Sequence, residues 1–165
     1  MIFLSVGSEL PFSRLVKAVD EWGRENSELD IVAQVGKLSE QDYVPLHSEH
    51  HDFVDPTKYS QLAEASVLMI AHAGMGSIIS AMTIGKPLVI MPRRAELREA
   101  TTDHQCATAK KFEGKEGIFV AWDESEIGQA ISNALEYAKQ AQFKRAEKFA
   151  PEDFIRRIRS FIVEA

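Results

Sequence analysis

The sequence predicts an α/β fold: an open, parallel, Rossmann-like sheet with helices on both of its faces. Two observations and one general rule predict it. Short apolar segments alternate with segments of helical periodicity almost to the end of the chain. The segment VLMIA at 67–71 has no polar alternation, which is typical of a central parallel strand covered on both faces. Strands and helices that alternate at this length wind right-handed into one parallel sheet.

The expected strands are short apolar runs, and the first two end directly before a glycine. They are expected at 2–6, 31–35, 51–54, 67–71, 88–91 and 118–121. Between the second and the third, the polar stretch 37–48 predicts a loop.

Helix signals separate these strands. Apolar residues recur at helical spacing over 12–22. Asp55 and Pro56 indicate the N-cap and first-turn proline of a second helix. A third helix is expected to stop at Gly85, which suits a glycine C-cap because a proline follows shortly after.

Three more helices complete the expected order. One is expected over 102–112. The next begins at Asp123, which forms a capping-box pattern with Glu126 and precedes an apolar stripe at helical spacing. The last opens at Pro151.

Length and composition indicate a single domain over 1–165, with no repeat, low-complexity segment or linker. The chain has 25 acidic and 19 basic residues, a net charge of −6, so its charge gives no general attraction for nucleic acid. The single Cys106 excludes an internal disulfide and a cysteine metal cluster. The start lacks the basic front of a signal sequence, and no apolar run approaches the roughly 20 residues of a membrane span, so a cytoplasmic protein is expected.

Ligands of open α/β sheets bind outside the carboxyl ends of the strands. Three loops leave such ends, at 7–11, 72–77 and 92–105. The chemistry of this chain is therefore expected in those three loops.

The loop at 72–77 carries two closely spaced glycines. Gly74 and Gly76, with Ser77, follow a strand and open a helix, whose free N–H groups favour a phosphate. The spacing is not the dinucleotide fingerprint, whose third glycine would fall at Ile79, nor a P-loop, because the Gly-Lys pair further on is followed by proline. On spacing alone, a tight turn without a ligand is an equally open interpretation.

Polar residues of the neighbouring loops favour the ligand. A phosphate held by N–H groups and arginine, beside groups that bind a ribose or base, describes a nucleotide-sugar site. The polar residues expected on this one rim are His72, Ser77, Arg93, Arg94, Asp103, His104 and Gln105.

The stretch HAGMGSIISAMTIGKPLVIMPR at 72–93, followed by DHQ at 103–105, resembles the C-terminal domain of glycosyltransferase family 28. That domain is the donor-binding half of a GT-B glycosyltransferase. The chain looks most like the single-domain branch, which includes the catalytic subunit of the dolichol-linked UDP-GlcNAc transferase and bacterial exopolysaccharide glycosyltransferase subunits. Members of this branch open much like MIFLSVGSELPFSRLVKAVDE, and the similarity covers residues 1 to about 125.

The resemblance implies inverting transfer from a UDP-sugar, with no cofactor and no metal held by the protein. It implies catalytic roles for His72 and Arg93. It implies donor binding by Gly7, Ser8, Gly74, Met75, Gly76, Ser77, Ser80, Asp103, His104 and Gln105. The chain departs from the family at Ser80, where a glutamate commonly binds the ribose hydroxyls, and at Thr108, where many relatives have asparagine. Serine is a weaker partner than a carboxylate, so these departures bear on donor affinity.

In two-domain relatives the catalytic base and most of the acceptor site lie on the other domain. The resemblance therefore implies a two-component enzyme. Its sugar, of the UDP-GlcNAc or UDP-glucuronic acid type, would pass to a lipid-linked acceptor in polysaccharide or glycolipid synthesis. A membrane-associated subunit would hold the acceptor, and this chain would lie at the inner membrane face through that partner.

The C-terminal stretch PEDFIRRIRSFIVEA predicts an amphipathic helix within 150–165. Its apolar face has two open interpretations. It packs on the domain's own sheet, or it docks on the partner with its arginines near anionic headgroups. The face comprises Phe154, Ile155, Ile158, Phe161 and Ile162.

Two other functions compete with transfer. The first is a non-catalytic nucleotide-sugar-binding or scaffolding subunit, which Ser80 favours. The second is an unrelated nucleotide-binding α/β domain, such as half of a sugar-nucleotide epimerase. The segment HSEHH at 47–51 matches no helical zinc motif, so no metal site is expected there.

Overall fold

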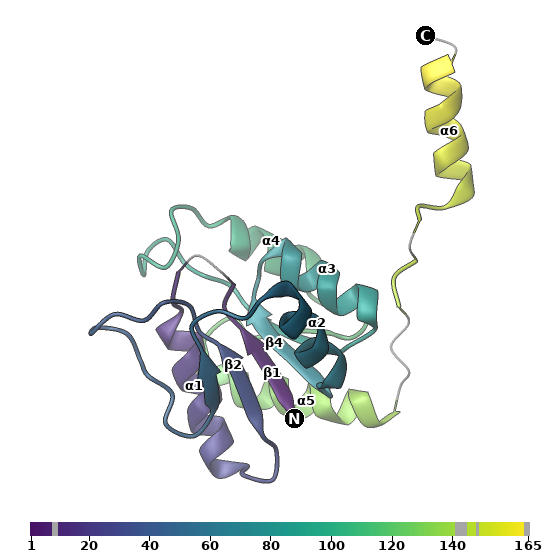
Figure 1. Cartoon of the computed structure of the whole chain (residues 1–165). Coiled ribbons are helices and arrows are strands. Elements are labelled where there is room, and N and C mark those ends of the chain that lie inside the picture. Colours follow the sequence, from purple (N-terminus) through teal and green to yellow (C-terminus); the bar gives the residue numbers. More distant parts are fainter. Residues whose placement is uncertain (8–9, 141–144, 148, 164–165) are drawn as a thin grey trace.

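The structure is a computed structural model that describes residues 1–7, 10–140, 145–147 and 149–163. Figure 1 shows a twisted sheet with helices on both sides and a last helix that stands apart from them. The α/β fold expected from the sequence is confirmed.

The described residues form a sheet of six strands, in which every paired neighbour is parallel and the order is β3-β2-β1-β4-β5-β6. The strands are β1 (Ile2–Ser5), β2 (Ile31–Gln34), β3 (Glu49–His51), β4 (Leu68–His72), β5 (Leu88–Met91) and β6 (Ile118–Val120). Ile2 of β1 is in register with Ile31 on one side and Leu68 on the other. The strand order therefore reverses between β1 and β4, at the centre of the sheet.

The edge strand lies earlier than the sequence predicts. A strand is expected over 51–54, whereas β3 ends at His51 and Phe53 and Val54 lie in the loop that follows. The N–H of Val54 donates to the side-chain oxygen of Gln34 at 3.0 Å rather than to a strand carbonyl. The expected bounds of this strand were wrong because Phe53 and Val54, two adjacent apolar residues in a loop, have the sequence pattern of a strand end.

Helices cover both faces of the sheet because alternate strand residues point to opposite sides. The helices are α1 (Ser13–Glu25), α2 (Pro56–Ala65), α3 (Met75–Ile84), α4 (His104–Phe112), α5 (Ile127–Gln140) and α6 (Glu152–Val163). Ile2 and Leu4 pack with α1 and α5 on one face, whereas Phe3 and Met69 pack with α2, α3 and α4 on the other. Each such buried apolar side chain contributes roughly 1.5–3 kcal/mol.

The helix ends follow their sequence signals. The Asp55 carboxylate accepts hydrogen bonds from the N–H groups of Thr57 and Lys58, at 2.8 and 3.0 Å, which confirms the expected N-cap of α2. Gly85 ends α3 with a left-handed φ of 69°, a conformation that glycine adopts without a steric penalty.

The pattern at Asp123 and Glu126 forms a related but different cap. Asp123 accepts from the N–H of Ser125 at the start of a short 3-10 helix, η1 (Glu124–Glu126), that leads into α5. Glu126 reaches back to the N–H of Trp122, at 2.7 Å, and not to the N–H of Asp123 that a capping box requires. With the added 3-10 turn, the Glu126 carboxylate accepts from the N–H one residue earlier than in a capping box.

One buried carboxylate fixes the long loop between β2 and β3. Asp20 of α1 is 1% exposed and accepts hydrogen bonds from four residues of that loop. They are the hydroxyl of Tyr43 (2.8 Å), the N–H groups of Leu46 (2.8 Å) and His47 (3.0 Å), and the hydroxyl of Ser48 (2.7 Å). Burial raises the pKa of Asp20, but these hydrogen bonds together outweigh it and leave the pKa below its ordinary value.

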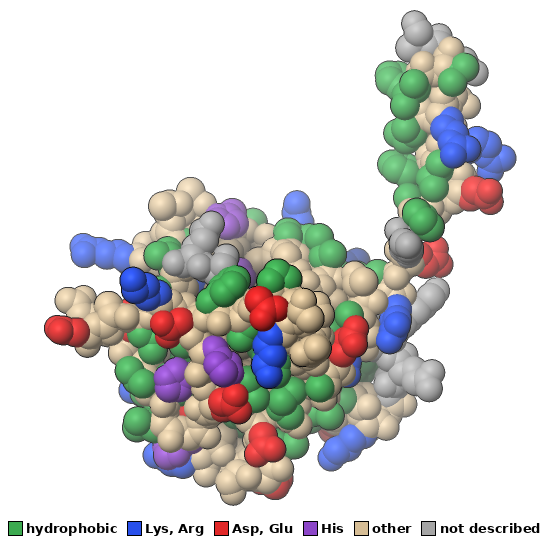
Figure 2. Space-filling model, viewed as in Figure 1, with side chains coloured by type: hydrophobic (Ala, Val, Ile, Leu, Met, Phe, Trp, Pro, Cys, Tyr) green, Lys and Arg blue, Asp and Glu red, His purple; other side chains and the backbone are tan. Residues whose placement is uncertain are grey.

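The helix α6 stands clear of the body, and none of its described residues is buried (Figures 1 and 2). The interpretation that its apolar face packs on the domain's own sheet is therefore wrong. Phe161 and Ile162 are 75% and 68% exposed. The chain between α5 and α6 touches the body at Ala146, whose N–H donates to the carbonyl of Met82 at 2.8 Å. No helix in the described part of the chain is long and apolar enough to cross a membrane.

Candidate functional site

A cleft opens where the strand order reverses. The chain leaves β1 for α1 on one face of the sheet and leaves β4 for α3 on the other, so the two connections diverge and leave a crevice between them. The crevice has a volume of about 780 Å³. It is lined by the loops after β1, β3, β4 and β5 and by the first turns of α2, α3 and α4.

Most of the residues that the sequence predicts line this cleft. They are Gly7, His72, Gly74, Met75, Gly76, Ser77, Ser80, Arg93, His104 and Gln105. Asp103 is exposed and is not among the lining residues; its carboxylate accepts from the N–H of Ala95 at 2.9 Å. Ser8 lies outside the described residues.

The imidazole of His72 explains two of the glycines. A Cβ atom on Gly7 would lie 3.0 Å from Cε1 of His72, and one on Gly74 would overlap the His72 ring. Gly7 also has a φ of 90°, in the region that favours glycine. The ring of His72 therefore packs between the two backbones, and both glycines serve that packing.

Gly76 has no such explanation within the protein. Apart from its chain neighbours and the backbone of its own helix, a Cβ atom there would have no described atom within 4 Å, although Gly76 lines the cleft in the first turn of α3. The N-cap, Gly74, offers no side chain to this helix end. The N–H groups of Met75, Gly76 and Ser77 therefore have no acceptor within the helix, and all three residues line the cleft.

Hydroxyl groups surround this helix end. Ser77, buried to within 7% exposure, and Ser80 come from α3, and Ser5 comes from the end of β1. Tyr59 of α2 joins them, with its ring packed edge-on against Phe3 at 5.1 Å. Burial raises the pKa of Tyr59, while the hydroxyls of Ser77, Ser5 and Ser80 oppose that rise. Hydroxyl groups can both donate and accept hydrogen bonds, so this part of the cleft has the chemistry to bind a polar ligand.

Tyr59 and Phe53 were not predicted from the sequence. Both follow β3, so they leave the carboxyl end of a strand just as the predicted loops do. Phe53 is 61% exposed and, with Val54, gives one end of the cleft an apolar wall. The strand-end rule missed them because Phe53 lay inside the strand expected over 51–54 and Tyr59 inside the helix expected after Pro56.

Arg93 lies in the cleft wall, 5% exposed, and its guanidinium faces the backbone. Nη2 donates to the carbonyls of Leu10 (2.7 Å) and Val6 (3.0 Å), and Nη1 to those of Pro11 (2.8 Å) and Glu99 (3.4 Å). The guanidinium also lies over the ring of Phe12, 4.5 Å from its centroid. Arg93 thus ties the loop after β1 to the loop after β5.

A buried side chain, that of Gln105, stabilises the loop after β5. Gln105 is 6% exposed, and its side-chain oxygen accepts from the N–H of Arg93 at 3.1 Å. The Nδ1 atom of His104 lies 2.7 Å from the hydroxyl of Thr102. Asp103 and Gln105 therefore shape the loop, whereas His104 stands at the exposed rim of the cleft.

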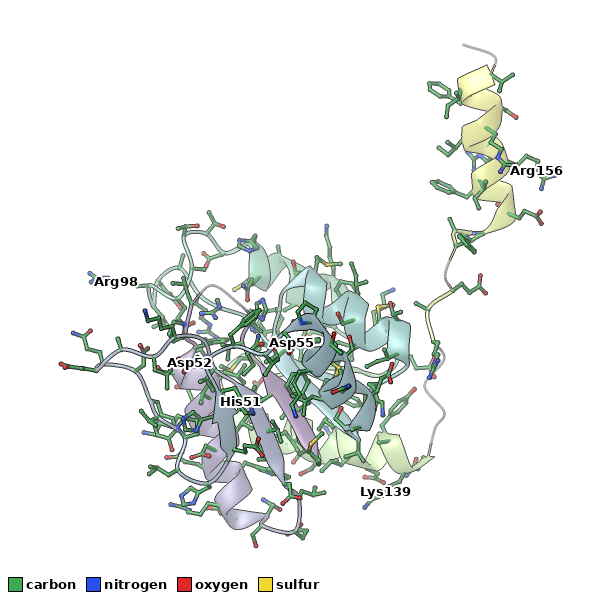
Figure 3. The ribbon with its side chains drawn as sticks, in the orientation of Figure 1. His51, Asp52, Asp55, Arg98, Lys139 and Arg156 are labelled. Atoms are coloured by element: carbon green, nitrogen blue, oxygen red, sulfur yellow. The ribbon has the colours of Figure 1, made fainter. Side chains whose placement is uncertain are left out.

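The described residues include no group of three or more His, Cys, Asp or Glu side chains arranged to hold a metal ion. In the segment at 47–51, His51 pairs with Glu49, with Nε2 3.0 Å from the carboxylate (Figure 3 labels His51 beside Asp52 and Asp55).

Solved structures share this fold. The glycotransferase of kitacinnamycin matches with a TM-score of 0.63 and 20% identity, over 84% of this chain and 36% of its own. Os79 from O. sativa, in complex with UDP, matches with a TM-score of 0.61 and 18% identity, over 99% of this chain and 40% of its own. The present chain thus spans less than half the length of either protein.

The solution structure of ALG13 is similar in length as well as in fold. It matches with a TM-score of 0.54 and 21% identity, over 95% of this chain and 93% of its own. These likenesses confirm the GT-B-type fold expected from the sequence.

Sequence comparison shows the family. No curated protein sequence matches the chain. The sequence profile of the glycosyltransferase family 28 C-terminal domain matches residues 1–158 of the 165. The match spans all six strands, both loops at the strand-order reversal and most of α6. The chain therefore belongs to the glycosyltransferase family 28 C-terminal domain family.

Proposed function

We propose that the chain is the donor-binding, catalytic subunit of a two-component inverting glycosyltransferase. It transfers a sugar from a UDP-sugar, of the UDP-GlcNAc or UDP-glucuronic acid type, to a lipid-linked acceptor in polysaccharide or glycolipid synthesis. The observation that carries the proposal is the open space above Gly76, where free helical N–H groups face a cleft lined with hydroxyls. Membership of a glycosyltransferase family supports sugar transfer as the reaction that takes place in that cleft.

In this proposal the diphosphate lies over the first turn of α3. Gly76 lets it approach the backbone, and the N–H groups of Met75, Gly76 and Ser77 donate to its oxygens. The nucleoside lies toward the apolar wall of Phe53 and Val54. The sugar then lies toward the loop after β5, near His104 and Gln105.

The chain's contribution to the reaction is to stabilise the leaving group. As the bond from the sugar to the diphosphate breaks, negative charge grows on the diphosphate, and donors already fixed in place stabilise it without reorganising. His72 and Arg93 act here through the backbone: His72 packs between Gly7 and Gly74, and Arg93 holds the two loops together. No cofactor enters the reaction, and the partner subunit supplies the base that deprotonates the acceptor.

The helix α6 is the proposed docking element for that partner. Most of its apolar face is exposed: Phe154, Ile158 and Phe161 are 53%, 46% and 75% exposed (Figure 2). Arg156, labelled in Figure 3, lies on the opposite side of the helix, and Arg157 lines the same shallow hollow as Arg156. A partner that covers the apolar face leaves these arginines free to meet anionic headgroups, which places the chain at the cytoplasmic membrane face.

Calorimetric titration with UDP, with ADP as the base control, tests donor binding. We expect UDP to bind and ADP to bind more weakly. A panel of UDP-sugars then identifies the donor, because selective binding to the native state raises the melting temperature. A folded chain that binds no uridine nucleotide would refute the proposal.

A non-catalytic donor-binding or scaffolding subunit is the second candidate. Ser80 favours it, because a neutral hydroxyl stands where relatives commonly have a carboxylate. Turnover measured after adding the acceptor-binding subunit separates the two. Transfer that depends on both proteins supports the catalytic function, whereas UDP-sugar binding without turnover supports the second candidate.

A further inference from the structure

The charged side chains that line the cleft are few. Among the described lining residues, Glu99 is the one carboxylate and Arg93 the one guanidinium. The guanidinium of Arg93 is directed at backbone carbonyls of the two loops. An anion that enters the cleft therefore shares it with one carboxylate, that of Glu99.

A second arginine, outside the cleft lining, holds that carboxylate. Arg14 of α1 donates to Glu99 through two parallel hydrogen bonds, Nε to Oε1 at 2.8 Å and Nη2 to Oε2 at 2.9 Å. The N–H of Arg94 adds a third, at 3.0 Å. The side chains of Arg14 and Glu99 are only 13% and 14% exposed, so water screens the pair weakly.

The other contacts of Arg14 are electrostatically weaker than its contact with Glu99. Its Nη1 lies 3.1 Å from the carboxylate of Glu124, which is 56% exposed and so largely screened by water. Its Nη2 also donates to the carbonyl of Pro92 at 3.2 Å. The fork-to-fork contact with Glu99 is thus the main electrostatic partnership of this guanidinium.

We propose that Arg14 determines the charge specificity of the cleft: by neutralising Glu99 it makes the site accept an anionic ligand, a nucleoside diphosphate. The inference rests on the proposed function, which places that anion in the cleft. The hydrogen bond with Glu99 is the largest effect that raises the pKa of Arg14, against the lowering effect of burial, so Arg14 keeps its charge at every working pH. Arg14 is a positioning residue, since it acts through Glu99 and not on the ligand.

Uridine and UDP separate a charge effect from a loop effect. Uridine fills the nucleoside end of the cleft without a charge. If Arg14 merely held the loop after β5 in shape, its removal would weaken both ligands alike. If it neutralises Glu99, its removal weakens UDP far more than uridine, because only UDP is repelled by the uncovered carboxylate.

Calorimetric titration of UDP and of uridine into the wild type and its variants provides the test. We expect Arg14→Met to weaken UDP by about tenfold and uridine by less than about twofold. Arg14→Lys, which keeps the charge but loses the fork, should stay near wild type. The double variant Arg14→Met/Glu99→Gln should recover UDP binding, because the repelling charge has gone.

Lys17→Met is the matched control. It removes the same charge from the same helix, but Lys17 is 57% exposed and pairs weakly with Glu21 at 3.9 Å. Its UDP affinity should equal that of the wild type. The loss in Arg14→Met should also shrink as salt rises, whereas a damaged loop would not recover with salt.

Several results would overturn the inference. Equal weakening of UDP and uridine in Arg14→Met makes the role structural. Failure of the double variant to recover UDP binding, at a wild-type circular dichroism spectrum, removes Glu99 from the explanation. A wild-type chain that binds neither UDP nor pyrophosphate refutes the proposed function, and this inference with it. Wild-type UDP binding with an unaffected Arg14→Met variant refutes this inference alone.

Discussion

The backbone of Gly74 lies against the imidazole of His72 so closely that a single methyl group at position 74 would overlap the ring. Two residues later, the same methyl group at Gly76 would touch no described atom beyond its neighbours in the chain and the backbone of its own helix. The two glycines of one loop therefore have different reasons to be glycine. The first serves packing within the protein, and the second leaves room for a ligand.

Alanine at each position distinguishes these reasons. We expect Gly74→Ala to destabilise the fold by about 1–3 kcal/mol, because the His72 ring is held by Gly7 on its other side and has to shift. Gly76→Ala should leave stability unchanged or raise it by up to about 1 kcal/mol, since alanine favours a helix. Urea unfolding measures both changes.

Gly76→Ala should weaken ligand binding even though it does not weaken the fold. Gly76→Ala places a methyl group where the diphosphate is proposed to lie, so UDP should bind about tenfold more weakly, which calorimetry measures. Full UDP affinity in a stable Gly76→Ala protein would mean that the ligand does not approach this helix end.

Arg93→Ala should loosen two loops at once. The carbonyls of Val6, Leu10 and Pro11 would lose their donors, at a cost of about 2–4 kcal/mol in unfolding free energy. Arg93→Lys should not restore stability, because an ammonium can neither reach the carbonyls as a fork nor stack on Phe12. Thermal unfolding checks both variants, and recovery by lysine would contradict the structural role.

Asp20 gives the fold a pH dependence of known sign. Its pKa in the folded chain is below the ordinary value of 3.8, so it contributes stability that is fully present above pH 3.8. That contribution is lost as the pH falls through the folded pKa. Asp20→Asn should cost about 1–3 kcal/mol at neutral pH and remove this part of the acid dependence. Denaturant unfolding at pH 7, 5 and 3 measures it; parallel curves for the two proteins would exclude Asp20 as the source.

Removing α6 should spare the body. Because none of its described residues is buried, deletion of 151–165 is expected to shift the melting temperature of the remainder by no more than about 2 °C. The deleted chain should still bind UDP and should fail to bind the acceptor-holding subunit, as measured by co-purification.

Point substitutions refine the docking test. Phe161→Asp places a charge on the apolar face and should abolish association, whereas Ser160→Asp, on the polar side, should not. Equal behaviour of the two variants would exclude the apolar face as the contact surface.

Local signals predicted the fold well. The apolar run of β4, the N-cap at Asp55 and the C-cap at Gly85 each act within a few residues, so the sequence shows them directly. The bounds expected for the third strand were wrong for a non-local reason. The N–H of Val54 donates to the side chain of Gln34, twenty residues earlier, and so does not pair with a neighbouring strand.

The site was predicted in position but less well in detail. The strand-end rule located the cleft at three loops, because parallel strands bring their carboxyl ends together. The contacts of Arg93 could not be foreseen, since backbone carbonyls up to 87 positions away carry no residue-type signal. For the same reason the pairing of Arg14 with Glu99, 85 positions apart, appears only in the folded chain.

The isolated position of α6 also bears on how the two halves of such an enzyme would meet. A protein that holds this helix keeps the rest of the chain tethered nearby, so the second encounter, between cleft and acceptor, becomes intramolecular. Its frequency then depends on the reach of the connecting chain and no longer on how much of each protein a cell makes.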